Sequence, residues 1–433
     1  MVFFIALIFH IIHYKKNWFI WYFINMPIII FLYYIIPGKS FGTGIVYFHL
    51  IEYLSVFIAS IFVLKKKELK ENKLKISYTF LKLFTIIQIA AIFNSSNPIY
   101  TLYNSFYVYL SLSSAIVYYK IFSFSDKSKI YFDKMMKNIV LLLFGYVIII
   151  FIYSFFDFKS ISYYDDSIIS TGKINFYSNY IFAYSCIIVM YLILRKEKSD
   201  LMKYVLYVIV LLSTIFIFFM IAKRAYLIIS ILGIGIIGIA AIRSHTMKFI
   251  GVIILIFTFG ILFSKKIDIN FYQKRNEAIQ QSYFESNRFY EYFYYFNYFY
   301  KNQKLWNKLF GEEYFNSYEA DYFSIKSLKL YDRNRILHSD YSIIIYGCGT
   351  IGLMIYLAYL FSIIIKYKKI EKQKISKSTK LIGITFTAIF YSLLLNGFID
   401  GYNDFINRFA PFSYLGTFLG MFEYENQNSR NPK

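Results

Sequence analysis

Long apolar runs alternate with short charged segments along almost the whole chain. A helix needs about 20 apolar residues to cross the hydrocarbon core of a bilayer, and about twelve runs approach that length. Because backbone polar groups in lipid must be paired within their own segment, we expect each run to be a helix. The expected spans are 18–36, 43–64, 77–93, 99–119, 138–157, 176–194, 202–221, 225–242, 249–264, 342–365, 380–397 and 411–423.

Basic residues between these runs predict the orientation of the helices, because Lys and Arg accumulate on the cytoplasmic side of a membrane. Successive basic clusters enclose pairs of spans, so all of them fall on one side. Both termini are then cytoplasmic, the first dozen residues set aside. The clearest clusters are Lys65 to Lys75, Lys120 to Lys137, Arg195 to Lys203, Arg243 to Lys248 and Lys366 to Lys380.

The spans divide the chain into three parts. Residues 1–264 hold the first nine spans, and Met1 to Ile12 lacks the basic start and cleavage site of a signal peptide, so it predicts a short or interfacial helix. Residues 265–341 form a large outer loop of mixed charge, in which we expect short helices. Residues 342–433 hold the last spans and a short cytoplasmic tail. The sequence predicts an all-α polytopic membrane protein.

Composition supports the bilayer as solvent, with 58% hydrophobic and 17% charged residues and a mean hydropathy of +0.48. The net charge of +22 would also suit nucleic acid, but the lysines lie in short loops, where they set membrane topology. We therefore expect no nucleic-acid partner. Cys186 and Cys348 lie in apolar segments and predict core packing, with neither a disulfide framework nor a metal cluster.

Arginines on the outer side are exceptions to the charge bias. Arg224, after Lys223, opens an outer helix, and Arg288 lies early in the large loop. A guanidinium grips phosphate with two hydrogen bonds, so an anionic lipid-linked headgroup is a natural ligand. The simpler interpretations are an interfacial anchor for Arg224 and a surface residue paired with Glu285 or Glu291 for Arg288.

The loop closes on Arg335, His338, Ser339, Asp340 and Tyr341, directly before an apolar run. Imidazole suits general-base chemistry near neutral pH, and Asp340 would either orient His338 or cap the helix. The alternative is a Ser339 or Asp340 cap beside a bystander histidine.

Two further groups of charges also carry alternatives. His49 and Glu52 share one face of a predicted span and are either functional or a pair that holds helices together. Asp400, Asp404 and Arg408 precede the last span and either border an outer cavity or belong to a solvated turn.

The order of these residues resembles the O-antigen polymerase and O-antigen ligase superfamily. That family shows an arginine motif opening a helix, a long periplasmic loop that begins with an arginine, a Leu-Phe-Gly-like turn and a closing histidine motif. The counterparts here are Lys223-Arg224-Ala225, Arg288, Leu309-Phe310-Gly311, His338-Ser339-Asp340-Tyr341 and Gly349-Thr350-Ile351-Gly352-Leu353. The first motif lacks the usual Ser and Gly, and Ser339 replaces the commoner Asn.

The resemblance implies a multi-pass protein of the bacterial cytoplasmic (inner) membrane whose site faces the periplasm. Its substrate would be an oligosaccharide on a polyprenyl pyrophosphate, and its reaction a metal-independent glycosyl transfer without a cofactor. His338 would be the base, Arg224 and Arg288 would bind pyrophosphate, and Asp340, Tyr341, Arg335 and Lys223 would support them. A chain-length regulator and a flippase are the implied partners.

Three functions fit this picture. A polymerase would extend an O-antigen or capsule chain, and a ligase would transfer the glycan to lipid A core or another acceptor. A flippase or other transporter of the same substrate belongs to a different class, and it predicts short loops and internal symmetry, which the sequence lacks.

Overall fold

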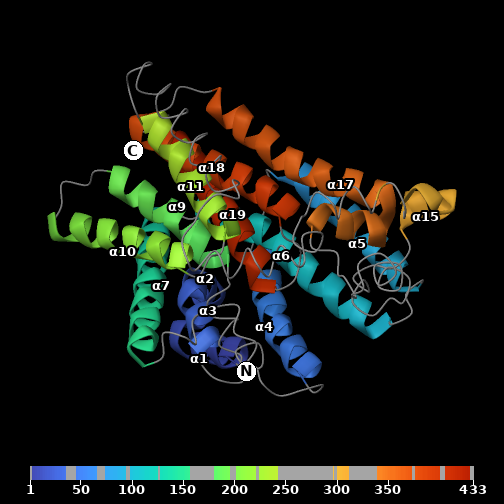
Figure 1. Ribbon diagram of the computed structural model, residues 1–433, viewed down its shortest axis with the longest axis horizontal. Helices are drawn as coiled ribbons and strands as arrows, with labels where there is room; N and C mark the ends of the chain where they lie inside the picture. The colour runs from blue at the N-terminus through green and yellow to red at the C-terminus, as the bar shows by residue number, and fades with distance from the viewer. Residues whose placement is uncertain are drawn as a thin grey trace, which may run out of the picture.

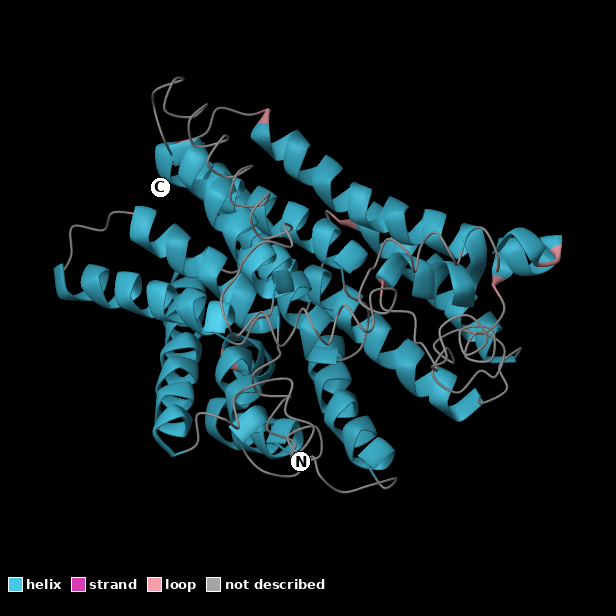
Figure 2. Cartoon of the chain, viewed as in Figure 1, coloured by secondary structure: helices cyan, strands magenta, loops and turns pink. Residues whose placement is uncertain are grey.

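The computed structural model describes residues 2–35, 45–65, 74–93, 98–124, 127–156, 180–195, 201–220, 224–241, 296, 300–311, 339–372, 376–399 and 405–429. Within these ranges the regular structure is entirely helical (Figures 1 and 2). The α-helices are α1 (Val2–Tyr14), α2 (Trp18–Ile24), α3 (Met26–Ile35), α4 (Ile45–Lys65), α5 (Lys75–Phe93), α6 (Pro98–Phe124), α7 (Ser128–Phe156), α9 (Tyr180–Leu194), α10 (Leu201–Met220), α11 (Arg224–Ala241), α15 (Leu305–Phe310), α17 (Asp340–Glu371), α18 (Lys377–Ile399) and α19 (Phe405–Asn428). Short 3₁₀ turns occupy Lys15–Asn17 and Tyr300–Asn302.

Several helices are long and apolar enough to cross a membrane. Among the described residues there are five, within α5, α7, α10, α17 and α18, and α9 and α11 are shorter apolar helices. Large apolar side chains on their outer surfaces, such as Phe93, Leu212 and Met354, are exposed over more than half of their area. A surface so rich in exposed apolar groups suits lipid, which indicates a polytopic integral membrane protein.

The predicted spans coincide with helices in every case except 249–264, which lies outside the described residues. Several boundaries were wrong. Helix α7 begins at Ser128, although we predicted a start at 138. The span predicted at 18–36 is divided into α2 and α3, and α19 begins at Phe405, although we predicted a start at 411. The first dozen residues do form a short helix, α1.

The break between α2 and α3 occurs at Asn25, two residues before Pro27, which cannot continue an intrahelical hydrogen bond. Asn138 of α7 repairs the break, because its amide Nδ2 donates to the carbonyl of Ile24 and to Asn25 Oδ1, both at 3.0 Å. Asn25 in turn contacts His10 Nε2 through its own Nδ2 at 3.0 Å. A polar chain therefore joins α1, the break and α7.

Helix α19 lies at the centre of the bundle, where it contacts α6, α9 and α18 (Figure 1). Its contact with α6 depends on Gly416 and Gly420, four residues apart. A Cβ atom on Gly416 would lie 2.2 Å from the carbonyl oxygen of Ala115, and one on Gly420 would lie 2.7 Å from that of Tyr119. Such small-residue pairs let helices in membranes approach backbone to backbone.

Helices α17 and α19 run in the same direction, since a charge pair joins them near each end. Near their starts Asp340 meets Arg408. Near their ends Lys366 Nζ lies 3.0 Å from Glu423 Oε2, and Glu423 also accepts hydrogen bonds from Tyr119 of α6 and from Gln427. These two polar clusters fix the register of the helices.

Candidate functional site

The start of α17 is where the large loop ends, and Ser339 is its N-cap. The Ser339 hydroxyl accepts a hydrogen bond from the backbone N–H of Ser342 at 3.4 Å and donates one to the carbonyl of Gly397 at 3.1 Å. Of the two capping residues that the sequence allowed, the structure selects Ser339. Asp340 is thereby released for another role.

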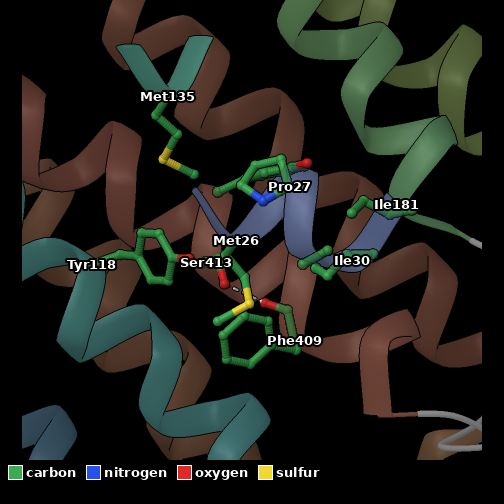
Figure 3. Close-up of a pocket in the computed structure, with 10 residues that line it drawn as sticks. Met26, Pro27, Ile30, Tyr118, Met135, Ile181, Phe409 and Ser413 are labelled. Atoms are coloured by element: carbon green, nitrogen blue, oxygen red, sulfur yellow. Dashed lines mark hydrogen bonds between the residues drawn. The ribbon is translucent and has the colours of Figure 1, made fainter. Parts of the chain in front are cut away.

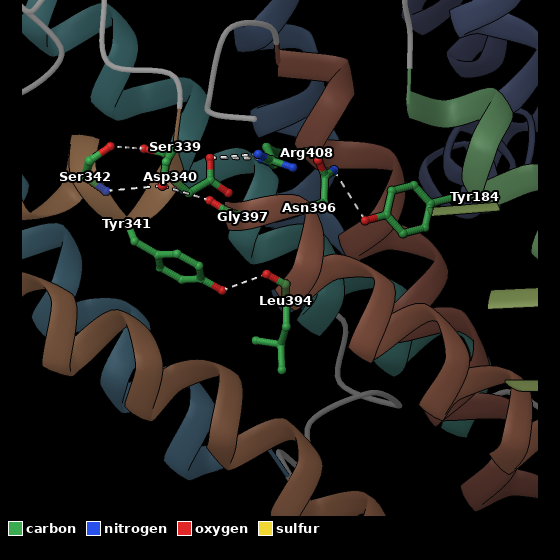
Figure 4. Close-up of polar contacts among 9 residues, drawn as sticks. All are labelled: Tyr184, Ser339, Asp340, Tyr341, Ser342, Leu394, Asn396, Gly397 and Arg408. Carbon is green, nitrogen blue, oxygen red and sulfur yellow. Dashed lines mark hydrogen bonds and ion pairs between the residues drawn. The ribbon is translucent and has the colours of Figure 1, made fainter. Parts of the chain in front are cut away.

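Asp340 forms an ion pair with Arg408 in the interior of the bundle (Figure 4). Its Oδ1 accepts from Arg408 Nη2 at 2.8 Å and from Nε at 3.2 Å. The two side chains are 1% and 0% exposed. Because an isolated buried charge costs several kcal/mol of desolvation, each of these groups depends on the other.

The sequence left two interpretations open for Arg408, the border of an outer cavity and a solvated turn. The structure shows that the solvated turn is wrong for this residue. The residue lies in the first turns of α19, fully buried, and it is the largest of the fully buried side chains among the described residues. Hydropathy placed the start of this helix too late because it counts a buried, neutralised arginine as polar surface. Asp400 and Asp404 lie outside the described residues.

The end of α18 surrounds the ion pair with polar groups (Figure 4). The Tyr341 hydroxyl donates to the carbonyl of Leu394 at 3.0 Å, and Asn396 Nδ2 donates to the Tyr184 hydroxyl at 3.4 Å. Gly397 lies against the Tyr341 ring, so that a Cβ atom there would be 3.0 Å from it. The beginning of α17 and the end of α18 are therefore locked together, and Asn396 extends the polar cluster to α9.

Helix α17 consists of two helical segments joined at Gly349, whose φ of 67° and ψ of −172° interrupt the helix. The short helix α15 docks on this break. Gly311, whose φ is 86°, lies against the backbone of α17, and Gly349 lies against the backbone of α15. A Cβ atom on either glycine would lie about 2 Å from backbone atoms of the other helix.

Two side-chain hydrogen bonds hold the docked loop segment. Thr350 Oγ1 donates to the carbonyl of Lys308 at 2.9 Å, and the Tyr300 hydroxyl lies 2.8 Å from the same Oγ1. The Leu309-Phe310-Gly311 turn and the glycines that follow the histidine motif, about forty residues apart in the chain, are thus in backbone contact.

Among the predicted site residues, Asp340 and Tyr341 are described with their side chains, and Arg224 is described only as the first residue of α11. Tyr226, two residues after it, packs on Tyr180 of α9 with ring centroids 4.5 Å apart. Tyr184, one turn further along α9, bonds to Asn396. The start of α11 therefore lies at the same end of the bundle as the Asp340–Arg408 pair. Lys223, Arg288, Arg335 and His338 lie outside the described residues.

Glu52 holds helices together, and the side chain of its predicted partner His49 lies outside the description. Its carboxylate Oε2 accepts from the backbone N–H groups of Phe3 at 2.7 Å and Phe4 at 3.2 Å. These donors belong to the first turn of α1, where intrahelical acceptors are lacking. Glu52 of α4 thus caps α1 and binds it to the bundle.

The polar cluster at the end of the bundle is distinct from a small pocket at the break between α2 and α3 (Figure 3). That pocket is partly open, has a volume of about 180 Å³ including its open side, and is lined mainly by apolar side chains, among them Met26, Pro27, Tyr118 and Phe409. Ligand sites usually exceed about 300 Å³, so we assign it no substrate. Within the described ranges, no group of three or more His, Cys, Asp or Glu is arranged to hold a metal ion.

No family model matches the chain, and no curated protein matches it either. The resemblance to the O-antigen polymerase and ligase superfamily stays a prediction from the sequence motifs. The geometry at the end of the bundle is the observation on which a function must rest.

Proposed function

We propose that this protein polymerises oligosaccharide repeat units carried on polyprenyl pyrophosphate, at the outer face of a bacterial cytoplasmic membrane. The observation that carries the proposal is the docking of Leu309-Phe310-Gly311 on the break in α17, a helix whose first residue belongs to the buried Asp340–Arg408 pair. Two motifs that the sequence resemblance singles out are in contact, and the start of α11, where Arg224 lies, is at the same end of the bundle.

The proposed step is a glycosyl transfer. A hydroxyl of the acceptor sugar attacks the anomeric carbon of the donor, and the bond between that carbon and the pyrophosphate oxygen breaks. The acceptor's proton passes to His338, and the leaving polyprenyl pyrophosphate carries the electron pair. Arg224 and Arg288 stabilise the charge that develops on the leaving group. Each group has the chemistry that its step requires.

Asp340 and Arg408 act as positioning residues in this scheme. Their mutual neutralisation leaves Arg408 poorly suited to bind pyrophosphate, because its Nε and Nη2 groups already donate to Asp340. Ser339 and Asp340 instead fix the first turn of α17 against α18 and α19. That turn directly follows His338 in the sequence, so a rigid start of α17 would hold the base at a defined place.

The proposal includes about twelve membrane spans, a large outer loop and a site that faces the periplasm or exterior. A chain-length regulator and a flippase would be its partners. A ligase would use the same donor and the same residues with a different acceptor, so only the product distinguishes it from a polymerase.

A transporter of lipid-linked oligosaccharide is the second candidate. The observation in its favour is a broken helix, α17, whose first residue belongs to a buried ion pair. Broken helices and buried charges also occur at the substrate sites of transporters. In a transporter the Asp340–Arg408 pair would open during the cycle, whereas a polymerase requires it to stay closed.

Polysaccharide electrophoresis from a gene-deletion strain tests the function. Complementation with Arg224→Ala, Arg288→Ala or His338→Ala should yield a single repeat unit on the surface, at least about 100-fold less long-chain glycan, and normal amounts of protein in the membrane. Complete loss of attached glycan would indicate a ligase, and cytoplasmic accumulation of precursor would indicate a transporter.

The chain offers matched control variants. Arg195, paired with Asp133 at 2.8 Å away from the candidate site, provides Arg195→Ala, and exposed His13 provides His13→Ala. Both should keep full-length glycan. Normal chain length in all three test variants would refute the enzymatic proposal.

A further inference from the structure

Helix α15 presents apolar side chains to its surroundings. Leu305 is 72% exposed, Trp306 64% and Phe310 37%, and the rings of Trp306 and Phe310 contact each other with centroids 4.3 Å apart. The helix itself is fixed to α17 by the glycine contact and by Thr350. Helix α15 lies at the edge of the molecule (Figure 1), docked on the break in α17. A rigidly held segment therefore exposes a tryptophan.

The same segment is strongly basic. Tyr300 to Gly311 contains three lysines and no acidic residue. Lys308 is used internally, since its Nζ donates to the carbonyl of Lys301 at 3.0 Å and lies 5.7 Å from the centre of the Tyr300 ring. Lys301 and Lys304 are exposed. Exposed tryptophan and leucine beside exposed lysine form the composition that favours a membrane–water interface carrying anionic lipid.

The length of α17 gives an independent measure of where α15 lies. From Thr350 to Glu371 the helix has about 22 residues and a length of about 33 Å, close to the hydrocarbon thickness of about 30 Å. Met354, Phe361 and Ile365 expose apolar side chains between these ends. Exposed Lys368 and Lys369 mark one membrane surface, so the break at Gly349, with α15 on it, lies at the opposite surface.

We propose that α15 is a membrane-interface anchor, with Leu305 and Trp306 inserted among the lipid chains and Lys301 and Lys304 at the phosphates of anionic phospholipids. The occupant of this surface is the bilayer itself. Anchoring would hold the segment of the large loop that docks on α17 at the membrane surface, and it requires only that the chain spans a membrane.

Tryptophan fluorescence tests the anchor, because the chain has three Trp residues, Trp18, Trp21 and Trp306. The Trp18→Phe/Trp21→Phe protein, reconstituted in vesicles of phosphatidylcholine and phosphatidylglycerol, reports on Trp306 alone. Phospholipids brominated near the top of the acyl chains should remove about half or more of its emission, whereas aqueous acrylamide should have little effect.

Three controls make the result decisive. Lys301→Gln/Lys304→Gln should weaken bromolipid quenching in phosphatidylglycerol and leave quenching in pure phosphatidylcholine unchanged, while Lys369→Gln should change neither. Strong acrylamide quenching without bromolipid quenching would place Trp306 in water and overturn the proposal. Protection from both quenchers would mean that protein covers Trp306, either a second copy or another partner, and would overturn it as well.

Discussion

Asp340 and Arg408 show how a single ion pair can organise the end of a helical bundle. Both side chains are excluded from solvent, and Arg408 directs Nε and Nη2 at the same carboxylate oxygen. In a low-dielectric interior such a pair is favourable only while both partners remain, because loss of one strands the other charge. The pair therefore constrains α17 and α19 to one arrangement.

We predict that Asp340→Asn and Arg408→Gln each lower the free energy of unfolding by about 3–5 kcal/mol, because each leaves an uncompensated or poorly paired buried group. The double variant Asp340→Leu/Arg408→Leu should recover a large part of this loss. Denaturant titration of the purified protein in mixed micelles measures the effect.

The partly exposed Arg195–Asp133 pair is the matched comparison. Its side chains are 20% and 39% exposed, so Arg195→Gln should cost about 1 kcal/mol or less. The loss of unfolding free energy in the double Asp340/Arg408 variant could instead equal the sum of the losses in the two single variants. That result would mean that the two charges do not depend on each other, contrary to the geometry.

At the scale of elements, the contact between α15 and α17 depends on two glycines in the left-handed region. Gly349 interrupts α17, and Gly311 ends α15. Each backbone fills the space that a side chain on the other would need. The docked position of this loop segment thus requires glycine at both places.

We predict that Gly349→Ala releases α15 from α17. The backbone conformation of Gly349 is essentially restricted to glycine and costs about 1–3 kcal/mol for another residue. The new Cβ atom would also lie 2.2 Å from the carbonyl oxygen of Leu309. Tryptic cleavage after Lys304 and Lys308 in membrane vesicles should become faster by about tenfold or more, since about 1.4 kcal/mol changes an equilibrium tenfold.

Gly238→Ala is the control for this experiment. Gly238 lies in α11 with its nearest neighbour, Met190 Cε, at 3.9 Å from a new Cβ atom. Its cleavage pattern should match that of the unaltered protein. An unchanged pattern in Gly349→Ala would show that the glycine contact does not hold α15.

Hydropathy was sufficient to locate most helices, because their apolar runs are long. It could not find the division at Asn25, where Asn138 of a distant helix donates to the carbonyl of Ile24 and to the side chain of Asn25. It could not find the early start of α19 either, since the partner that neutralises Arg408 is sixty-eight residues away. The Gly416-x-x-x-Gly420 spacing was a readable signal for close helix packing that the sequence interpretation missed.

In the candidate site, too, local features could be predicted from the sequence, whereas contacts between distant segments could not. The N-cap at Ser339 could be predicted as one of two choices, because capping is local. The pairing of Asp340 with Arg408 depends on three helices meeting, and no pattern in either segment encodes it. The convergence of Arg224, Arg288 and His338 stays a prediction.

At the scale of the whole molecule, α17 and α19 share a charge pair at each end. From Thr350 to Lys366 along α17 is about 24 Å, and from Arg408 to Glu423 along α19 is about 23 Å. These equal intervals place the Asp340–Arg408 pair at about the level of the break in α17. The candidate site and the docked loop segment therefore lie at about the same level along the two helices.

We predict that opposite ends of α17 are reached from opposite sides of the membrane. In spheroplasts, a membrane-impermeant maleimide should label Lys301→Cys, beside α15, and should label Lys369→Cys only after the membrane is permeabilised, because the lysine-rich end is retained in the cytoplasm. Cys186 and Cys348 are fully buried, so the unaltered protein is its own unlabelled control. Labelling of Lys369→Cys alone in intact spheroplasts would show that the topology is the reverse of the predicted one, with α15 in the cytoplasm. That position would contradict the proposed polymerisation at the outer face of the membrane. Equal labelling of both variants would contradict the span from Thr350 to Glu371 and, with it, the placement of α15 at the opposite membrane surface.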